Sequence, residues 1–270
     1  MRVSPATVPD IVVGDQIANF TADFVDYRGS RLVGVDSNLW APAGLNFRVS
    51  LAVYHRAAQT AGKLVGGDIA AKVLRGRAFF MSPGIQNLAG RHISFKFQEV
   101  SSGLQVDVVT FAIYPDALNL STPISPRQVA GRTILLDLPI FDNDGRLLTS
   151  IRSADGFWVR ANVSKFKNGK WVPCSCLSQD EVLVEDGIAS FTRLSVTSVG
   201  SFMLNFTLPR GKHSTLSFLT TGFDVFAAAI AVSNSSLAPE YTLDDVLGNV
   251  TVILQDFHGN FMPDVDKEFD

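Results

Sequence analysis

Apolar side chains occupy every second position in many short runs of this chain, and small polar or charged side chains fill the positions between them. In residues 200–208 the apolar set is Phe202, Leu204, Phe206 and Leu208. Since successive side chains of a β-strand point to opposite faces, this alternation predicts strands with one buried face. Turn residues separate the runs about every 8 to 12 residues, as in β-sandwiches. No segment keeps a helical apolar period over several turns, and the pattern therefore predicts an all-β fold of antiparallel sandwiches.

The same four-residue turn occurs three times along the chain. Residues 26–29, 142–145 and 256–259 all read D-x-x-G, and their glycines lie 116 and then 114 residues apart. An Asp side chain accepts hydrogen bonds from its own turn and Gly tolerates a positive φ, so each motif predicts a hairpin turn. A period of this length predicts tandem domains that are each long enough to bury a core.

The second half of each period is also repeated. Residues 76–80 and 187–191 both read G-x-A-x-F, and a Gly-initiated strand with aromatic residues at period two follows each of them. We therefore predict three units, which are residues 1–122, residues 123–237 and residues 238–270. The last unit holds a linker and only the first strands of a third copy. We interpret the chain as a piece of a larger protein on this ground.

Two segments depart from simple alternation. Residues 57–72 are rich in Ala and Gly, and we expect a short helix or a mobile loop there. Residues 216–232 form the most apolar window, but they fall short of the about 20 residues that a membrane-spanning helix needs, and they include Asp224. We therefore expect a strand in this window and no membrane insertion within this segment.

Composition limits the classes of protein to which the chain can belong. The chain is 46% apolar and 18% charged, which is typical of a folded globular protein and not of a disordered one. The net charge is −3, and Lys and Arg are scattered singly. Because nucleic-acid binding needs a basic patch or stripe, we expect no nucleic-acid partner.

Six asparagines begin the N-x-S/T sequence that accepts N-linked glycans, where chance would supply about one or two. They are Asn19, Asn119, Asn162, Asn205, Asn234 and Asn249. Strand alternation places Asn162 and Asn205 opposite the apolar face of their strands, where a glycan faces solvent. The sequons therefore predict a glycosylated protein that is extracellular or on a cell surface.

Two observations stand against secretion. The N-terminal residues, M-R-V-S-P-A, lack the apolar stretch of a signal peptide. The only cysteines, Cys174 and Cys176, are too close in sequence to staple a domain. Both observations agree with an extracellular location if the chain is one part of a larger protein whose sandwiches are stable on their hydrophobic cores.

Cys174 and Cys176 leave three interpretations open. In a strand the two thiols would share one face about 6 to 7 Å apart, at the outer limit for a disulfide. The two residues are an ordinary pair of thiols, a local or inter-chain disulfide, or part of a metal site. The metal site has the least support, because structural zinc needs four ligands.

The remaining polar residues contain no signature of catalysis or of a cofactor. A calcium loop starting at Asp142 would need Glu at its twelfth position, which is Ser153, so a hairpin turn is favoured there. The four histidines show no shared spacing, and no nucleophile elbow, zinc-protease or phosphate-loop motif occurs. We therefore expect no catalytic residue, metal or cofactor, and no enzyme activity.

Three tryptophans are the remaining candidates for ligand contact. They are Trp40, Trp158 and Trp171. We interpret them as core or strand-edge residues, and a sugar-stacking platform is the alternative.

The succession of D-x-x-G, G-x-A-x-F and a Gly-initiated aromatic strand resembles the immunoglobulin-like repeats of filamins and of bacterial surface proteins of the invasin kind. The resemblance covers nearly the whole chain, but its motifs are structural, so it assigns no functional residues. The Cys…Trp…Cys pattern of antibody domains is missing.

The resemblance implies a tandem rod of β-sandwiches for spacing, adhesion or scaffolding. We therefore expect non-catalytic structural or adhesion repeats from the ectodomain of a larger glycosylated protein, with proteins or glycans at a cell surface as partners. The alternatives are a glycan- or protein-binding module, a cytosolic filamin-like scaffold and, more remotely, an accessory domain of a glycosidase.

Overall fold

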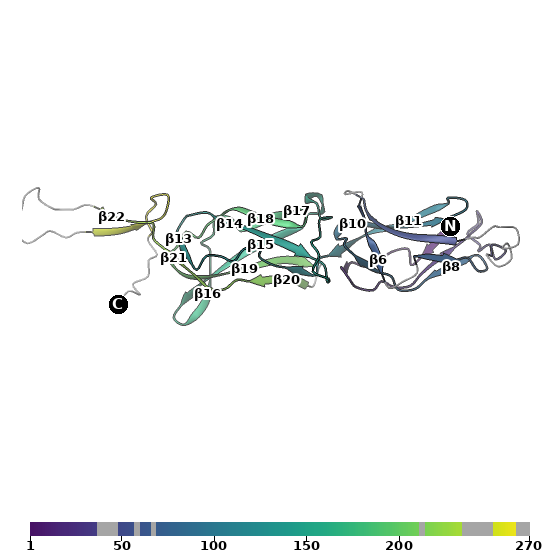
Figure 1. Cartoon of the computed structure of the whole chain (residues 1–270), viewed down its shortest axis with the longest axis horizontal. Helices are drawn as coiled ribbons and strands as arrows, with labels where there is room; N and C mark the ends of the chain where they lie inside the picture. Colours follow the sequence, from purple (N-terminus) through teal and green to yellow (C-terminus); the bar gives the residue numbers. More distant parts are fainter. Residues whose placement is uncertain (37–47, 57–59, 66–68, 211–213, 234–250, 263–270) are drawn as a thin grey trace, which may run out of the picture.

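The computed structural model describes residues 1–36, 48–56, 60–65, 69–210, 214–233 and 251–262. These residues form β-strands joined by turns, with one single-turn 3-10 helix, η2, at Ser153–Asp155. The strands build two sandwiches that follow one another along the long axis of the molecule, and a two-stranded C-terminal hairpin continues the line (Figure 1). The expectation of an all-β fold is confirmed.

The first sandwich contains strands β1 to β11. Their bounds are β1 Arg2–Ser4, β2 Ile11–Val12, β3 Phe20–Asp23, β4 Arg48–His55, β5 Thr60–Ala61, β6 Lys63–Val65, β7 Ala70–Lys72, β8 Arg77–Phe80, β9 Gly84–Gln86, β10 Gly90–Glu99 and β11 Gln105–Tyr114. One sheet has the order β1-β3-β8, and the other has the order β2-β11-β10-β4-β5 with β7 also on β4. β2 and β11 pair in parallel, whereas the other pairs of these two sheets are antiparallel.

The second sandwich contains strands β12 to β21. Their bounds are β12 Ala117–Leu118, β13 Arg127–Val129, β14 Ile134–Phe141, β15 Trp158–Lys167, β16 Lys170–Cys174, β17 Glu181–Glu185, β18 Ile188–Leu194, β19 Gly200–Arg210, β20 Ser214–Leu219 and β21 Phe223–Phe226. One layer has the order β12-β14-β18-β17, and the other has β15-β19-β21-β13 with β16 on β15 and β20 on β19. β13 and β21 pair in parallel, and β17 also pairs with the start of β15.

The alternating apolar residues form the two cores, as the sequence predicts. In the first core the Phe20 ring lies 5.1 Å from Phe95 and 5.5 Å from Phe97, measured between ring centroids. In the second core the rings of Phe191 and Phe206 lie 5.4 Å apart. These side chains are almost completely buried, which gives each sandwich its main stabilising term.

The three D-x-x-G turns have the same hydrogen bonds. In the second turn the Asp142 side chain accepts from the N–H groups of Asp144 and Arg146, at 2.9 and 2.8 Å. Asp26 and Asp256 accept from the residues two and four positions later in the same way. Gly145 has φ +76°, a region that L residues rarely adopt, so Gly is required for this turn. The predicted hairpin turns are confirmed.

The C-terminal hairpin consists of β22, Ala229–Ser233, and β23, Thr251–Gln255. Its pairing of Ile230 with Leu254 corresponds to that of Leu118 with Ile140 at the start of the second sandwich. Leu118 falls within the predicted first unit, yet β12 pairs with the second sandwich. The unit boundaries stay a proposal, and this pairing favours an earlier end for the first unit.

The structure corrects two expectations about the less regular segments. Residues 57–72 contain the short strands β5, β6 and β7 in their described part instead of a helix. The apolar window at residues 216–232 holds parts of β20, β21 and β22 instead of a single strand, because Gly222 and its neighbours interrupt the pairing. The part of the chain that the structure describes contains no helix long and apolar enough to cross a bilayer.

Candidate functional site: the junction between the sandwiches

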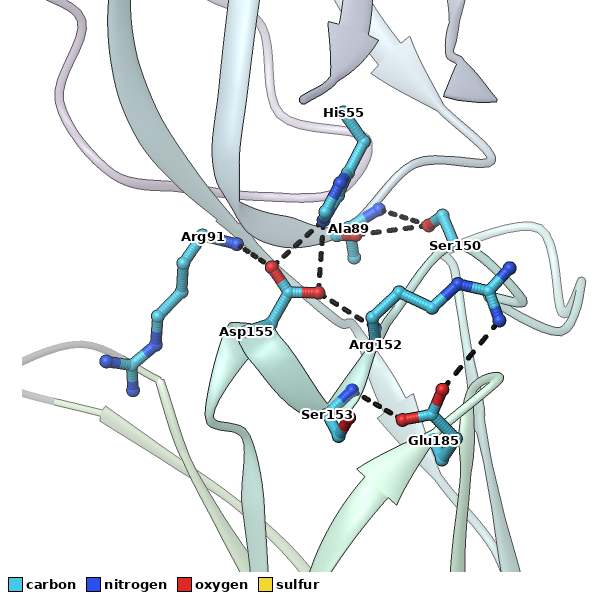
Figure 2. Close-up of polar contacts among 8 residues, drawn as sticks. All are labelled: His55, Ala89, Arg91, Ser150, Arg152, Ser153, Asp155 and Glu185. Carbon is cyan, nitrogen blue, oxygen red and sulfur yellow. Dashed lines mark hydrogen bonds and ion pairs between the residues drawn. The ribbon is translucent and has the colours of Figure 1, made fainter. Parts of the chain in front are cut away.

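The most developed polar site lies where the first sandwich meets the second, and we call it the junction. The first sandwich contributes His55 at the end of β4 and residues 89–91 at the start of β10. The second sandwich contributes Ser150 and Asp155, from the segment after its D-x-x-G turn. Figure 2 shows the Asp155 carboxylate pointing from η2 toward the His55 ring.

His55 and Asp155 form an ion pair or hydrogen bond across the junction. The Nε2 atom of His55 lies 2.9 Å from Oδ1 and 3.0 Å from Oδ2 of Asp155. Both side chains are 0% exposed. Because an ionised carboxylate only accepts, Nε2 donates its hydrogen in this contact. Removing one partner of a buried pair leaves the other uncompensated and costs about 3–5 kcal/mol.

Backbone groups from both sandwiches complete the shell of Asp155. The Arg91 N–H donates to Oδ1 at 2.8 Å, and the Arg152 N–H donates to Oδ2 at 2.8 Å (Figure 2). Burial alone would raise the pKa of Asp155. Hydrogen bonds from His55, Arg152 and Arg91 outweigh burial and hold this pKa below its usual value. Asp155 is therefore a stable carboxylate at neutral pH.

Ser150 makes a second polar link between the sandwiches. Its Oγ accepts from the Ala89 N–H at 3.0 Å and donates to the Ala89 carbonyl oxygen at 3.1 Å (Figure 2). Ser150 and Ala89 are both buried. The Ser150 side chain therefore satisfies both the N–H and the C=O group of Ala89, which are buried where the second sandwich covers the first.

Close packing surrounds these polar contacts. The rings of Tyr114 and Phe157 lie 5.6 Å apart, and the Arg91 guanidinium lies 5.5 Å from the Phe157 ring centroid. A Cβ atom added to Gly14 would lie 2.5 Å from the Asn143 side chain, so this glycine permits the D-x-x-G turn to approach. The junction thus joins the two sandwiches by packing as well as by polar bonds.

The arrangement suits a structural contact better than chemistry. His55, Asp155 and Ser150 are residue types of a catalytic triad, but the Ser150 hydroxyl is used by Ala89 and all three side chains are buried. A substrate therefore has no access to them. Within the described ranges, no group of three or more His, Cys, Asp or Glu side chains is arranged to hold a metal ion.

The structure places four of the six predicted glycosylation sites. Asn19, Asn119 and Asn162 are exposed, and Asn205 is half-buried. Asn162 on β15 and Asn205 on β19 are direct cross-strand partners. Asn234 and Asn249 lie outside the described residues. Glycan occupancy at all six sites stays a prediction.

The two cysteines are bonded to each other in the structure. The Cα atoms of Cys174 and Cys176 lie 5.4 Å apart, and the bond closes a three-residue loop after β16. Cys176 is buried and Cys174 is half-buried. The loop bonds within the second sandwich, since Cys174 pairs with Val163 and the Cys176 carbonyl oxygen accepts from the Thr197 N–H at 2.9 Å.

The tryptophans of the described residues are strand residues with exposed faces. Trp158 is 45% exposed and Trp171 is 41% exposed, so neither belongs to a core. Trp171 packs edge-on against Phe166, with ring centroids 5.2 Å apart, near the Asn168–Gly169 turn. Both turn residues have positive φ, as the two central residues of a tight turn between the antiparallel strands β15 and β16 require. Trp40 lies outside the described residues.

Comparison with known proteins finds solved structures and no sequence relative. No family model matches the sequence, and no curated protein sequence matches it. A tetra-tandem repeat from the extending region of a large adhesion protein is similar in structure, with TM-score 0.40 and 14% identity over 90% of this chain and 60% of that one. A titin structure has TM-score 0.35 and 7% identity, over 84% of this chain and 100% of that one. Extracellular domains 3–5 of Drosophila OTK have TM-score 0.30 and 9% identity, over 93% and 74%.

The strand order itself defines the class of protein. In the second sandwich β12, β14, β18 and β17 correspond to strands A, B, E and D of an immunoglobulin fold, and β16, β15, β19 and β21 correspond to C′, C, F and G. The chain is therefore a tandem array of immunoglobulin-like β-sandwiches. The narrower resemblance to filamin or invasin repeats stays a prediction.

Proposed function

We propose that this chain is a non-catalytic, stiff segment of a larger glycosylated cell-surface or secreted protein, where it spaces or presents an adhesive region. The observation that carries the proposal is the buried His55–Asp155 contact between consecutive sandwiches. Domains of one chain usually move relative to one another unless their interface is substantial. A junction that breaks only at the cost of a buried polar pair keeps two sandwiches in line.

Distance measurement between the sandwiches tests the stiffness. Spin labels at Gln105→Cys on β11 and Thr215→Cys on β20, both exposed, report on one sandwich each. We expect a narrow distance distribution for the otherwise unchanged chain and a broad one after Asp155→Ala. Glu185→Gln is the matched control, because Glu185 bonds to Ser153 within the second sandwich. A broad distribution in the unchanged chain would contradict a stiff segment.

Treatment with an endoglycosidase tests the cellular location. Protein from its native host should shift in mobility, because Asn19, Asn119 and Asn162 present exposed acceptor side chains. A protein without glycan would instead support a cytosolic scaffold, the function that leaves all sequons unused.

A ligand-binding module is the second candidate function. The aromatic pair Phe166 and Trp171, 43% and 41% exposed at the tip of the β15–β16 hairpin, favours it. Exposed aromatic rings supply much of the contact energy at protein and sugar interfaces. A glycan and protein array tests this function, with Trp171→Ala as the matched variant. A specific hit that the variant loses would count against a purely spacing role.

A further inference from the structure

The D-x-x-G turn contacts the sandwich before it at two places along the chain. At the junction, Gly14 lies against Asn143, the second residue of the second turn. At the start of the third copy, Gly131 lies against Asp256, where an added Cβ would be 3.1 Å from Oδ2. The Phe257 N–H also donates to the Ala130 carbonyl oxygen at 2.8 Å. Gly14 and Gly131 therefore both leave room for a D-x-x-G turn of the following unit.

The sandwiches present these glycines through the same local structure. The Val13 N–H bonds to Tyr114 and the Gly14 N–H bonds to Ile85, at 2.8 and 2.9 Å. In the second sandwich, Ala130 and Gly131 donate in the same way to Phe226 and Val196, both at 2.8 Å. We call this surface the glycine end. The turn end is the D-x-x-G turn together with the residues up to ten positions after its Asp.

The turn end of the first sandwich is made like the other two but is open. Leu32, Leu148 and Met262 each follow their turn Asp by six residues, and each donates its N–H to the carbonyl oxygen of the residue two positions before that Asp. Leu148 is 1% exposed and Met262 is 7% exposed, whereas Leu32 is 41% exposed. Tyr27 is 88% exposed, and its counterpart Phe257 is 60% exposed. The first copy therefore exposes an apolar side chain, Leu32, at a position that is buried in both later copies.

We propose that the turn end of the first sandwich, residues 26–36, is a docking surface for the glycine end of a further immunoglobulin-like repeat placed before it in the same polypeptide. The partner is a repeat of the second sandwich's type, because the Ala130–Gly131 surface of that sandwich already accepts a D-x-x-G turn through the Phe257 N–H and the Asp256 side chain. The inference rests on the proposed rod function and specifies how the rod is extended.

A fused chain tests the proposal. Residues 117–230, the second sandwich with its linker strand, are placed directly before Arg2. This fusion point keeps the strand register of the existing junction. Leu118 pairs with the residue two positions before Asp142, and Ile230 would pair in the same way with the residue two positions before Asp26. Amide hydrogen exchange of residues 27–34 is measured in the fused and the unfused chains. We expect exchange to slow by at least about tenfold in the fused chain.

Leu32→Glu is the matched control variant. It should restore fast exchange in the fused chain and leave the melting temperature of the unfused chain unchanged, since Leu32 is exposed there. Equal exchange in fused and unfused chains would overturn the proposal, as would protection that survives Leu32→Glu. Self-association of the unfused chain that Leu32→Glu abolishes would also overturn it, because a second copy would then occupy the surface.

Protection at residues 143–151 separates this inference from the rod function. These residues lie at the existing junction and should exchange slowly in every chain. If they are protected but residues 27–34 of the fused chain are not, the docking proposal fails and the rod function stands. If they exchange fast in the unfused chain, the stiff junction itself is absent.

Discussion

Gly90 packs against the imidazole of His55. A Cβ atom on Gly90 would be 2.3 Å from Nε2 of His55 and 3.0 Å from Oδ1 of Asp155, and the residue has φ +150°. A side chain at this position therefore displaces the buried pair and strains the backbone. We expect Gly90→Ala to lower the free energy of unfolding by about 2–4 kcal/mol, measured by urea denaturation.

Gly103→Ala is the control for backbone strain alone. Gly103 also has positive φ, +71°, but a Cβ there meets nothing within 4 Å. Its cost should be about 1–2 kcal/mol. Equal losses for the two variants would mean that the His55 contact adds nothing.

The stability of the junction should depend on pH through Asp155. Its pKa in the folded chain is lowered, so its contribution is complete above the pKa of the unfolded state, about 3.9, and is lost as pH falls through the folded pKa. We expect the difference in melting temperature between the unchanged chain and Asp155→Asn to shrink as pH falls below about 4. Calorimetry measures it, and a difference that grows on acidification would contradict the assignment.

Ser150→Ala should destabilise the chain because it leaves the buried Ala89 N–H without its acceptor. The expected loss is about 1–3 kcal/mol in chemical denaturation. Ser190→Ala removes a hydroxyl of the same kind from an exposed bond to Asp137, and it should cost less than about 0.5 kcal/mol. If the two variants lose the same stability, Ser150 does not link the sandwiches.

Asn162 and Asn205 compete for space as glycan acceptors because they are cross-strand partners on one face. Cross-strand Cβ atoms lie only about 4.5–5.5 Å apart, which is too close for both asparagines of one molecule to carry a branched glycan. When the chain is expressed in a secretory pathway, we expect intact mass to show one glycan for this pair, at the more exposed Asn162. Asn205→Gln should then change neither the glycan mass nor stability by more than about 1 kcal/mol. Full occupancy of both sites would refute the competition.

Alternation and repetition in the sequence predicted the strand faces and the turns, because both depend on residues that are close together in the sequence. Phe202, Leu204, Phe206 and Leu208 are all 0% exposed, because strand geometry alone decides which face they take. The D-x-x-G turns were predictable for the same reason, since Asp142 bonds to residues two and four positions away. The strands within residues 57–72 were not predicted, because Ala and Gly have weak strand propensity and pairing with β4 and β9 decides their conformation.

The junction could not be predicted from the sequence because its partners are distant and unrepeated. His55 and Asp155 are 100 residues apart. The corresponding glycine of the second sandwich, Gly200, packs on Lys165, so comparison of the two copies conceals the role of His55. The available signal was a buried histidine, His55, whose counterpart in the second copy is the buried Lys165. This signal can be recognised only when the pairing of the strands is known.

The parallel pairs β2–β11 and β13–β21 determine how each sandwich bears load. In each pair one strand lies near the start of its sandwich and the other is the last strand, so a pull on the two ends of the array draws the paired strands in opposite directions along their own length. The hydrogen bonds between them are then sheared together, whereas a hairpin pulled from its open end unzips one bond at a time. We therefore expect the parallel pair of each sandwich to resist tension on the chain ends before its core is exposed.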